Sequence, residues 1–182
     1  MTLDELAALR PRDLRPLLAS GHPIDPSTLD DTEYDGLSLG QPRWVERLTW
    51  SKFKKVFHRD PSGGLRGWNV TCEQDALDRP WTDRLRRGER ITYGFYRVHG
   101  PQGYRLPPGH DRGLVIDYAQ GGNRRLDPLR RVIDPLVALE PGGDLLLGYS
   151  LVRAGVSLPT PTWFALRRGA PLTYVAHGPG TN

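Results

Sequence analysis

Two carboxylates lie among apolar residues in segments whose pattern predicts strands: Asp117 in GLVIDYA and Asp134 in VIDPLV. A carboxylate is costly to bury unless it is paired, and desolvation raises its pKa. If either side chain faces a cavity, it could act as a general acid or base. Alternatively, each could be an ion-pair partner of a nearby arginine, with Arg97, Arg130 and Arg131 as the candidates. Because Asp134 precedes a proline, it could also hydrogen-bond the backbone that an irregular strand leaves free.

Aromatic side chains supply the other candidate groups. In ITYGFYRVH, strand alternation predicts that Tyr93, Phe95 and Arg97 share one face, with Tyr96 on the other. Tyrosine and tryptophan have an apolar body with a polar tip, which suits a cavity that orients a polarised ligand, although a filled core needs them equally. In any reaction, hydrogen-bond donation would come from Tyr93, Tyr96 or Tyr149. The candidate ligand-binding residues are Trp50, Phe53, Phe57, Trp68, Phe95, Arg97, Tyr118, Tyr149 and Trp163.

Motifs of the common enzyme classes are absent. The chain has no P-loop, no dinucleotide-type G-x-G-x-x-G, no H-E-x-x-H and no G-x-S-x-G, which argues against kinases, common NAD enzymes, zincins and α/β-hydrolases. None of the five histidines lies two or four residues from another. A haem would need a proximal ligand such as His58, His99 or His110, but we favour surface or turn positions for them. Cys72, the single cysteine, is interpreted as a core residue and not a nucleophile. We expect no metal and no cofactor.

Composition indicates one soluble domain over residues 1–182, because 37% of the residues are hydrophobic and 25% charged. The chain contains neither an apolar run of about 20 residues nor a secretory signal, so we expect a cytoplasmic protein without a membrane partner. The formal net charge of +4 rests on 22 arginines and three lysines, scattered among 21 acids. With 21 glycines and 17 prolines, this composition is typical of a GC-rich genome, and we expect no nucleic-acid partner.

Two segments predict helices. Thr2 and Glu5 match a capping box, and apolar residues continue past Pro11 to Gly21, which places an N-terminal helical segment within residues 1–32. A second helix is predicted over 43–57, in PRWVERLTWSKFKKVFH, with Pro42 at its start. Its apolar residues spread over more than one stripe. It should therefore be covered on two sides, or present Trp50, Phe53 or Phe57 to a ligand.

The rest of the chain predicts strands bounded by Gly, Pro, Asp or Asn. These are the segment 33–40 and the sequences LRGWNVTCEQ, ITYGFYRVHG, GLVIDYAQ, RRVIDPLVALE, DLLLGYSLVRAG and PTWFALRRG, with PLTYVAH as a possible eighth. EPGGD, at 140–144, predicts a hairpin turn. Helical periodicity is absent between the strands, so the sheet should be antiparallel and form a barrel or a sandwich.

The order of a helix, LDDTEYDGLSLG, and strands ending in LLLGYSLVRAG and TPTWFALRR resembles lipocalin-like (calycin) barrels, and the last two strands are similar to those of small GXWXG-type barrel domains. Gly36-Leu37-Ser38 stands where lipocalins carry Gly-X-Trp. The resemblance implies a mainly β, antiparallel barrel of seven or eight strands over 33–176, with an N-terminal helix and one inserted helix.

The same resemblance implies a central cavity, and the predicted function is binding of a small hydrophobic or aromatic molecule. The alternative is a cofactor-independent isomerase, cyclase or dehydratase in that cavity, with Asp117 or Asp134 as proton shuttle. A protein-interaction module would instead need an exposed apolar patch.

Overall fold

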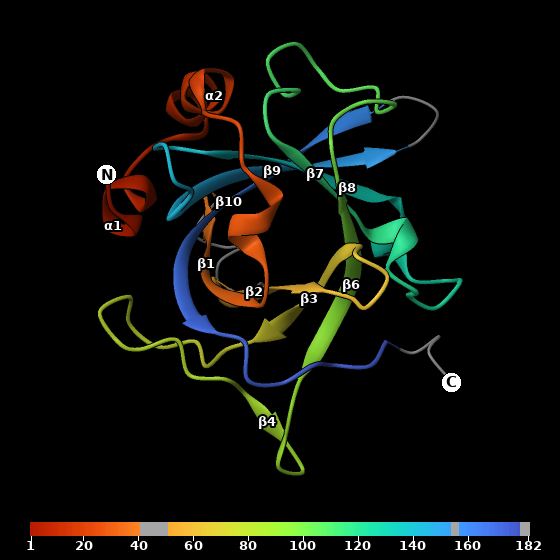
Figure 1. The fold of residues 1–182 in the computed structure, drawn as a ribbon. Helices are drawn as coiled ribbons and strands as arrows, with labels where there is room; N and C mark the ends of the chain where they lie inside the picture. Colours follow the sequence, from red (N-terminus) through yellow and green to blue (C-terminus); the bar gives the residue numbers. More distant parts are fainter. Residues whose placement is uncertain (41–50, 154–156, 179–182) are drawn as a thin grey trace.

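The structure is a computed structural model that describes residues 1–40, 51–153 and 157–178. In the described chain, eight antiparallel strands close into a barrel, each paired with its neighbour along the barrel and β10 paired with β1 (Figure 1). The barrel strands are β1 Thr32–Leu39, β2 Lys52–Arg59, β3 Leu65–Thr71, β6 Thr92–His99, β7 Leu114–Asp117, β8 Val132–Ala138, β9 Leu145–Arg153 and β10 Ser157–Pro171. The predicted mainly β antiparallel barrel is therefore confirmed.

The connections carry the remaining elements. A small hairpin between β3 and β6 consists of β4 (Leu85–Arg86) and β5 (Glu89–Arg90), outside the barrel (Figure 1). The described residues also form the 3-10 helices η1 Pro26–Leu29, η2 Tyr118–Gln120 and η3 Pro128–Arg131. The predicted EPGGD hairpin turn joins β8 to β9, and two glycines with positive φ form its tip.

The predicted N-terminal helical segment is present as two helices, α1 (Leu3–Ala7) and α2 (Pro11–Ser20). Thr2 and Glu5 form the expected capping box, and Pro11 begins the second helix instead of interrupting the first. Leucines of both helices pack outside the barrel against Leu147 and Trp163, in a cluster separate from the interior. The helices therefore cover one side of the barrel wall and leave its lumen free.

The predicted helix over 43–57 is wrong over its second half, because Lys52–Arg59 forms β2. Its first half, including Trp50, lies outside the described residues. β2 is buried on both faces: Phe53 and Phe57 pack in the interior, and Val56 packs outside against Trp68. A strand covered on both sides shows no apolar–polar alternation. This explains why its apolar residues suggested a doubly covered helix.

PLTYVAH does not supply the eighth strand, since residues 172–178 carry no strand and the eighth is β2. The segment runs along the outside of the barrel, where Ala176 packs against the outward side chains Trp68 and Phe95. Residues 172–176 therefore cover the outer face of β2, β3 and β6.

The two halves of the barrel interior differ in how completely side chains fill them. Near the ends where β1 and β9 begin, η1 lies across the opening, as the orange segment between α2 and β1 in Figure 1. Ile24 and Leu29 from this region join Tyr34 and Phe57 in the interior core. The Tyr34 hydroxyl donates to the carbonyl of Gly143 at 3.0 Å. This end is filled, and the interior space lies toward the other end.

Candidate functional site

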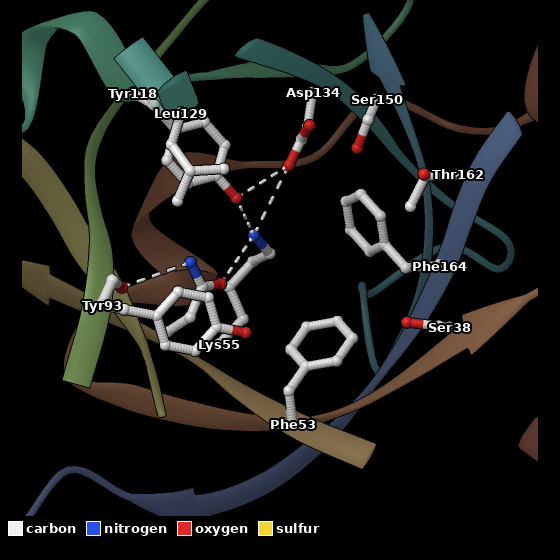
Figure 2. Close-up of a pocket in the computed structure, with 11 residues that line it drawn as sticks. Ser38, Phe53, Lys55, Tyr93, Tyr118, Leu129, Asp134, Ser150, Thr162 and Phe164 are labelled. Carbon is white, nitrogen blue, oxygen red and sulfur yellow. Dashed lines mark hydrogen bonds and ion pairs between the residues drawn. The ribbon is translucent and has the colours of Figure 1, made fainter. Parts of the chain in front are cut away.

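A pocket of about 340 Å³ occupies the unfilled half of the barrel. Its walls come from seven barrel strands together with η2 and η3 (Figure 2). The lining residues are Ser38, Phe53, Lys55, Asn69, Tyr93, Tyr118, Leu129, Asp134, Ser150, Thr162 and Phe164. Of the residues expected from sequence to bind or react, the pocket brings together Phe53, Tyr93, Tyr118 and Asp134.

Lys55 reaches into this space from β2, between the inward side chains of Phe53 and Phe57, and its side chain is only 2% exposed. Its ammonium donates to the hydroxyl of Tyr118 at 2.7 Å and to Asn69 Oδ1 at 3.1 Å (Figure 2). Asn69 is held in that orientation because its Nδ2 donates to the carbonyls of Tyr93 and Gly94. The lysine is thus fixed by hydrogen bonds to side chains on two other elements, β3 and η2.

Asp134, on β8, is the charged partner of this lysine. Its Oδ2 lies 3.6 Å from Lys55 Nζ and accepts a hydrogen bond of 3.0 Å from the Tyr118 hydroxyl. Its other oxygen, Oδ1, is buried with no partner at hydrogen-bond geometry among the described residues, and Ser150 lies nearby (Figure 2). Asp134, which lines the pocket, therefore has one buried acceptor oxygen with no described hydrogen-bond partner, although the Ser150 hydroxyl nearby favours the ionised carboxylate.

Burial shifts the pKa values of the two charged groups toward each other. Desolvation lowers the pKa of Lys55 to about 8, against the opposing effect of Asp134. Desolvation likewise raises the pKa of Asp134, although Lys55, Ser150 and Tyr118 favour its ionised form. Transfer of one proton from the ammonium to the carboxylate therefore costs far less here than in water.

Tyr118 connects the pair. It begins η2, its carbonyl accepts from Asn123 Nδ2, and the N-cap side chain of Asp117 holds the same turn by accepting from the amide of Ala119. Burial raises the pKa of Tyr118 well above its ordinary value, so its hydroxyl stays protonated. The hydroxyl can accept a proton from Lys55 while it delivers its own to Asp134.

Four aromatic rings surround the ammonium of Lys55. Its Nζ lies 4.9 Å from the ring centre of Tyr96 and 5.0 Å from that of Phe164, with Tyr118 and Phe53 at 5.2 and 5.9 Å. Such contacts stabilise a cation by about 0.5–2 kcal/mol each, more as the site is desolvated. These contacts offset part of the desolvation cost of the Lys55 ammonium that its attraction to Asp134 does not compensate.

Phe53 and Phe164 form the apolar wall and lie edge to face at 6.2 Å. Each ring fits over a glycine of a neighbouring strand: a Cβ at Gly36 would lie 2.5 Å from Phe53, and one at Gly148 would lie 2.1 Å from Phe164. The two glycines set how far the rings reach into the pocket.

The predicted alternation in β6 is wrong at its start. Gly94 adopts φ +56°, in the left-handed region that favours glycine. The kink turns both Tyr93 and Tyr96 toward the interior, where they line the pocket and the core, while Phe95 packs outside with Trp68. The two predicted tyrosines therefore lie on one side of the wall and not on opposite faces.

Asp117 does not share the pocket with Asp134. Its carboxylate pairs with Arg153 at 3.2 Å and accepts from the hydroxyl of Tyr104 at 3.1 Å. The expectation of an ion pair is confirmed for Asp117, but with Arg153 and not with an arginine named from sequence. Asp134 pairs with a lysine instead.

The three named arginines lie elsewhere. Arg97 pairs with Asp60 at 3.2 Å, Arg130 donates to the carbonyl of Asn123, and Arg131 contacts neither carboxylate in the described ion pairs. Arg97 borders separate surface depressions at the wall of the barrel.

Several expected ligand-binding residues lie outside the pocket. Tyr149 and Trp163 stack at 4.2 Å on the outer surface beneath the N-terminal helices, and Trp68 and Phe95 pack outside the opposite wall. Phe57 is interior but belongs to the filled core. The apolar patterns of these residues correctly predicted that they are buried. Both the inner and the outer face of these strands are buried, however, and the sequence does not distinguish one face from the other.

Cys72 is buried, and desolvation raises the pKa of its thiol to about 12, as expected for a core residue. In the part of the chain that the structure describes, no three His, Cys, Asp or Glu side chains gather in a way that could hold a metal ion. No described helix is long and apolar enough to cross a membrane.

Lys55 is the site residue that sequence reasoning missed. It falls within the predicted helix over 43–57, in a charged run with Lys52 and Lys54. The signal that could have found it is charge balance: a carboxylate buried in an apolar strand requires a cation, and strand alternation from Phe53 puts Lys55 on the same face.

Fold and site together define an eight-stranded up-and-down barrel with a buried lysine–aspartate pair at the base of an interior pocket. No protein-family model matches the chain, and no curated protein matches it at significant similarity.

Proposed function

We propose that the protein binds a small molecule with an apolar or aromatic body and one polar group, inside the barrel. The observation that carries this proposal is the interior pocket of about 340 Å³, which has aromatic walls and a polar base. Pockets for small molecules are typically about 300–1,000 Å³, mostly apolar, with a few polar groups that orient the ligand. The volume therefore favours a ligand of one or two rings.

The polar base determines how the ligand is oriented. A hydroxyl or amine of the ligand donates a hydrogen bond to the carboxylate of Asp134, which lines the pocket and whose Oδ1 has no described partner. The ligand's body lies between Phe53, Phe164 and Tyr93. A relationship to lipocalin-like barrels is part of the proposal, since these also bind ligands inside eight up-and-down strands. A cytoplasmic location stays a prediction from composition.

A second candidate function is acid–base catalysis in the same pocket without a cofactor. The shifts of Lys55 and Asp134 favour it, because titratable groups with perturbed pKa values in a cavity are characteristic of catalytic sites. Asp134 would be the proton shuttle and Tyr118 a hydrogen-bond donor. Asp117 has no part in this version, because it lies with Arg153 outside the pocket.

Calorimetric titration with a panel of one- and two-ring aromatic alcohols, amines and acids tests the binding proposal. We expect binding of one molecule per chain by a member that carries a hydrogen-bond donor. Thr162→Phe fills the pocket and should abolish this binding, whereas Thr173→Phe makes the same change at an exposed site and should not. Absence of binding across the panel, or equal binding by both variants, contradicts the proposal.

A further inference from the structure

Among the three lysines of the chain, Lys55 is the one whose amine lies in the pocket. Lys52 is engaged by Asp75 and two backbone carbonyls, and Lys54 forms ion pairs with Glu33 and Asp83. We propose that Lys55 is a nucleophile that forms a Schiff base with small aromatic aldehydes or ketones held in the barrel pocket. The inference rests on the proposed function and specifies the class of ligand.

The geometry supplies what an imine-forming lysine requires. The amine is fixed by Tyr118 and Asn69, so it loses little freedom on reaction. The surrounding rings of Phe53, Phe164 and Tyr96 exclude water from it and can pack against an aryl group. A dry site with an amine of lowered pKa is the usual way to activate a lysine toward a carbonyl.

The proton needed for activation has a defined route. Lys55 donates to the Tyr118 oxygen, and Tyr118 donates to Asp134 Oδ2. Transfer along this chain turns the ammonium and the carboxylate into a neutral amine and a carboxylic acid, and Tyr118 ends with one proton, as it began. The titratable groups that face the amine are Asp134, Tyr118, Tyr93 and Tyr96, and burial raises the pKa of each tyrosine. Lys55 and Asp134 are therefore the groups that exchange the proton.

The reaction balances on these residues alone. The Lys55 nitrogen forms a bond to the carbonyl carbon, the C=O π bond opens, and a proton moves from nitrogen to oxygen to give a carbinolamine. The acid form of Asp134 then returns its proton to the carbinolamine hydroxyl, the C–O bond breaks, and water leaves. The products are a protonated imine and the Asp134 carboxylate. The carboxylate, 3.6 Å from Lys55 Nζ in the free protein, is the counter-ion of the imine.

Reductive trapping with benzaldehyde and cyanoborohydride tests the inference in the intact protein. Fragmentation of the modified peptide distinguishes Lys52, Lys54, Lys55 and the amino group of Met1. We expect one benzyl adduct, on Lys55, with a trapping rate that rises through pH about 8, where this amine loses its proton. Benzyl alcohol has the same shape but cannot form an imine, so it should slow the trapping by competition.

Two variants extend the test. Lys55→Arg keeps a cation opposite Asp134 but removes the nucleophile, and it should lose the adduct at least tenfold. The matched Lys54→Arg keeps Lys55 and should retain it. If Lys55→Arg does not fold, the peptide map of the unmodified sequence still decides, because an adduct on Lys54 or Met1 without one on Lys55 refutes the inference.

The outcomes separate this inference from the proposed function. If benzyl alcohol binds in the calorimeter, and Thr162→Phe abolishes that binding, but no adduct forms on Lys55, the pocket binds ligands and the covalent step is wrong. If neither compound binds and no adduct forms, both the covalent inference and the proposed function are wrong. An adduct on Lys55 that Thr162→Phe prevents supports both.

Discussion

Removing one partner of the Lys55–Asp134 pair should destabilise the fold far more than removing both. The relevant variants are Lys55→Met, Asp134→Leu and their combination. Each side chain is only 2% exposed, so a single replacement leaves the other charge buried without its counter-charge. Such an orphaned charge costs about 3–5 kcal/mol. For a chain of this length, that cost lowers Tm by roughly 6–20 °C.

The distance between the charges gives the size of their coupling. At the observed 3.6 Å and an effective dielectric constant of about 20, two unit charges attract by about 4–5 kcal/mol. In the double variant neither charge is buried, but Tyr118 and Asn69 lose a hydrogen-bond partner, at about 1–3 kcal/mol for the unsatisfied groups. We expect the double variant to lie within about 3 kcal/mol of the parent protein, against about 6–10 for the sum of the single changes.

Urea unfolding followed by circular dichroism at pH 7, evaluated as a double-mutant cycle, measures this coupling. Circular dichroism of the folded double variant controls for loss of the barrel. If the two single changes add within about 0.5 kcal/mol, the side chains are not energetically coupled and the site description is wrong.

Three further predictions concern residues around the site. Asp117→Asn should cost only about 1–2 kcal/mol in urea unfolding and leave ligand affinity unchanged in calorimetry, since Arg153 can reach solvent and the pair lies outside the pocket. Gly148→Ala should push the Phe164 ring into the pocket, weaken ligand binding and cost about 1–3 kcal/mol; unchanged affinity contradicts this. The pKa of Cys72 is raised from 9.0 to about 12, so the unfolded thiol loses its proton first and the free energy of unfolding falls as pH rises above 9. Cys72→Ala should reduce this fall between pH 8 and 10, and an identical fall in both proteins contradicts it.

Local signals made the architecture predictable. The turn glycines at 142–143 and the capping box of Thr2 and Glu5 act within a few residues of the chain. The turn and the cap therefore form independently of the tertiary packing around them. The absence of helical periodicity after β3 excluded crossover helices and so required an antiparallel order. These features depend little on tertiary context, and each is present in the structure.

The inner and outer faces of the wall were not predictable in the same way. Helices α1 and α2 cover one side and residues 172–176 cover another, so outward residues such as Trp163 and Trp68 are as apolar as inward ones. Burial alone then cannot tell a ligand-binding aromatic residue from one in the wall. At Gly94 the change of face follows from a backbone conformation that only the folded chain reveals.

The contrast between Asp134 and Lys55 shows how half of a site can be found from sequence. A carboxylate between Ile133 and Pro135 contradicts the composition of its strand, whereas Lys55 lies in a charged run where it attracts no notice. Yet arginine supplies 22 of the 25 basic residues, and the three lysines all fall within four positions. Arginine is always charged and its planar fork needs several acceptors, while lysine is compact and can lose its proton when buried. If Lys55 reacts as a neutral amine, as we propose, lysine and not arginine is the basic residue expected in this aromatic space.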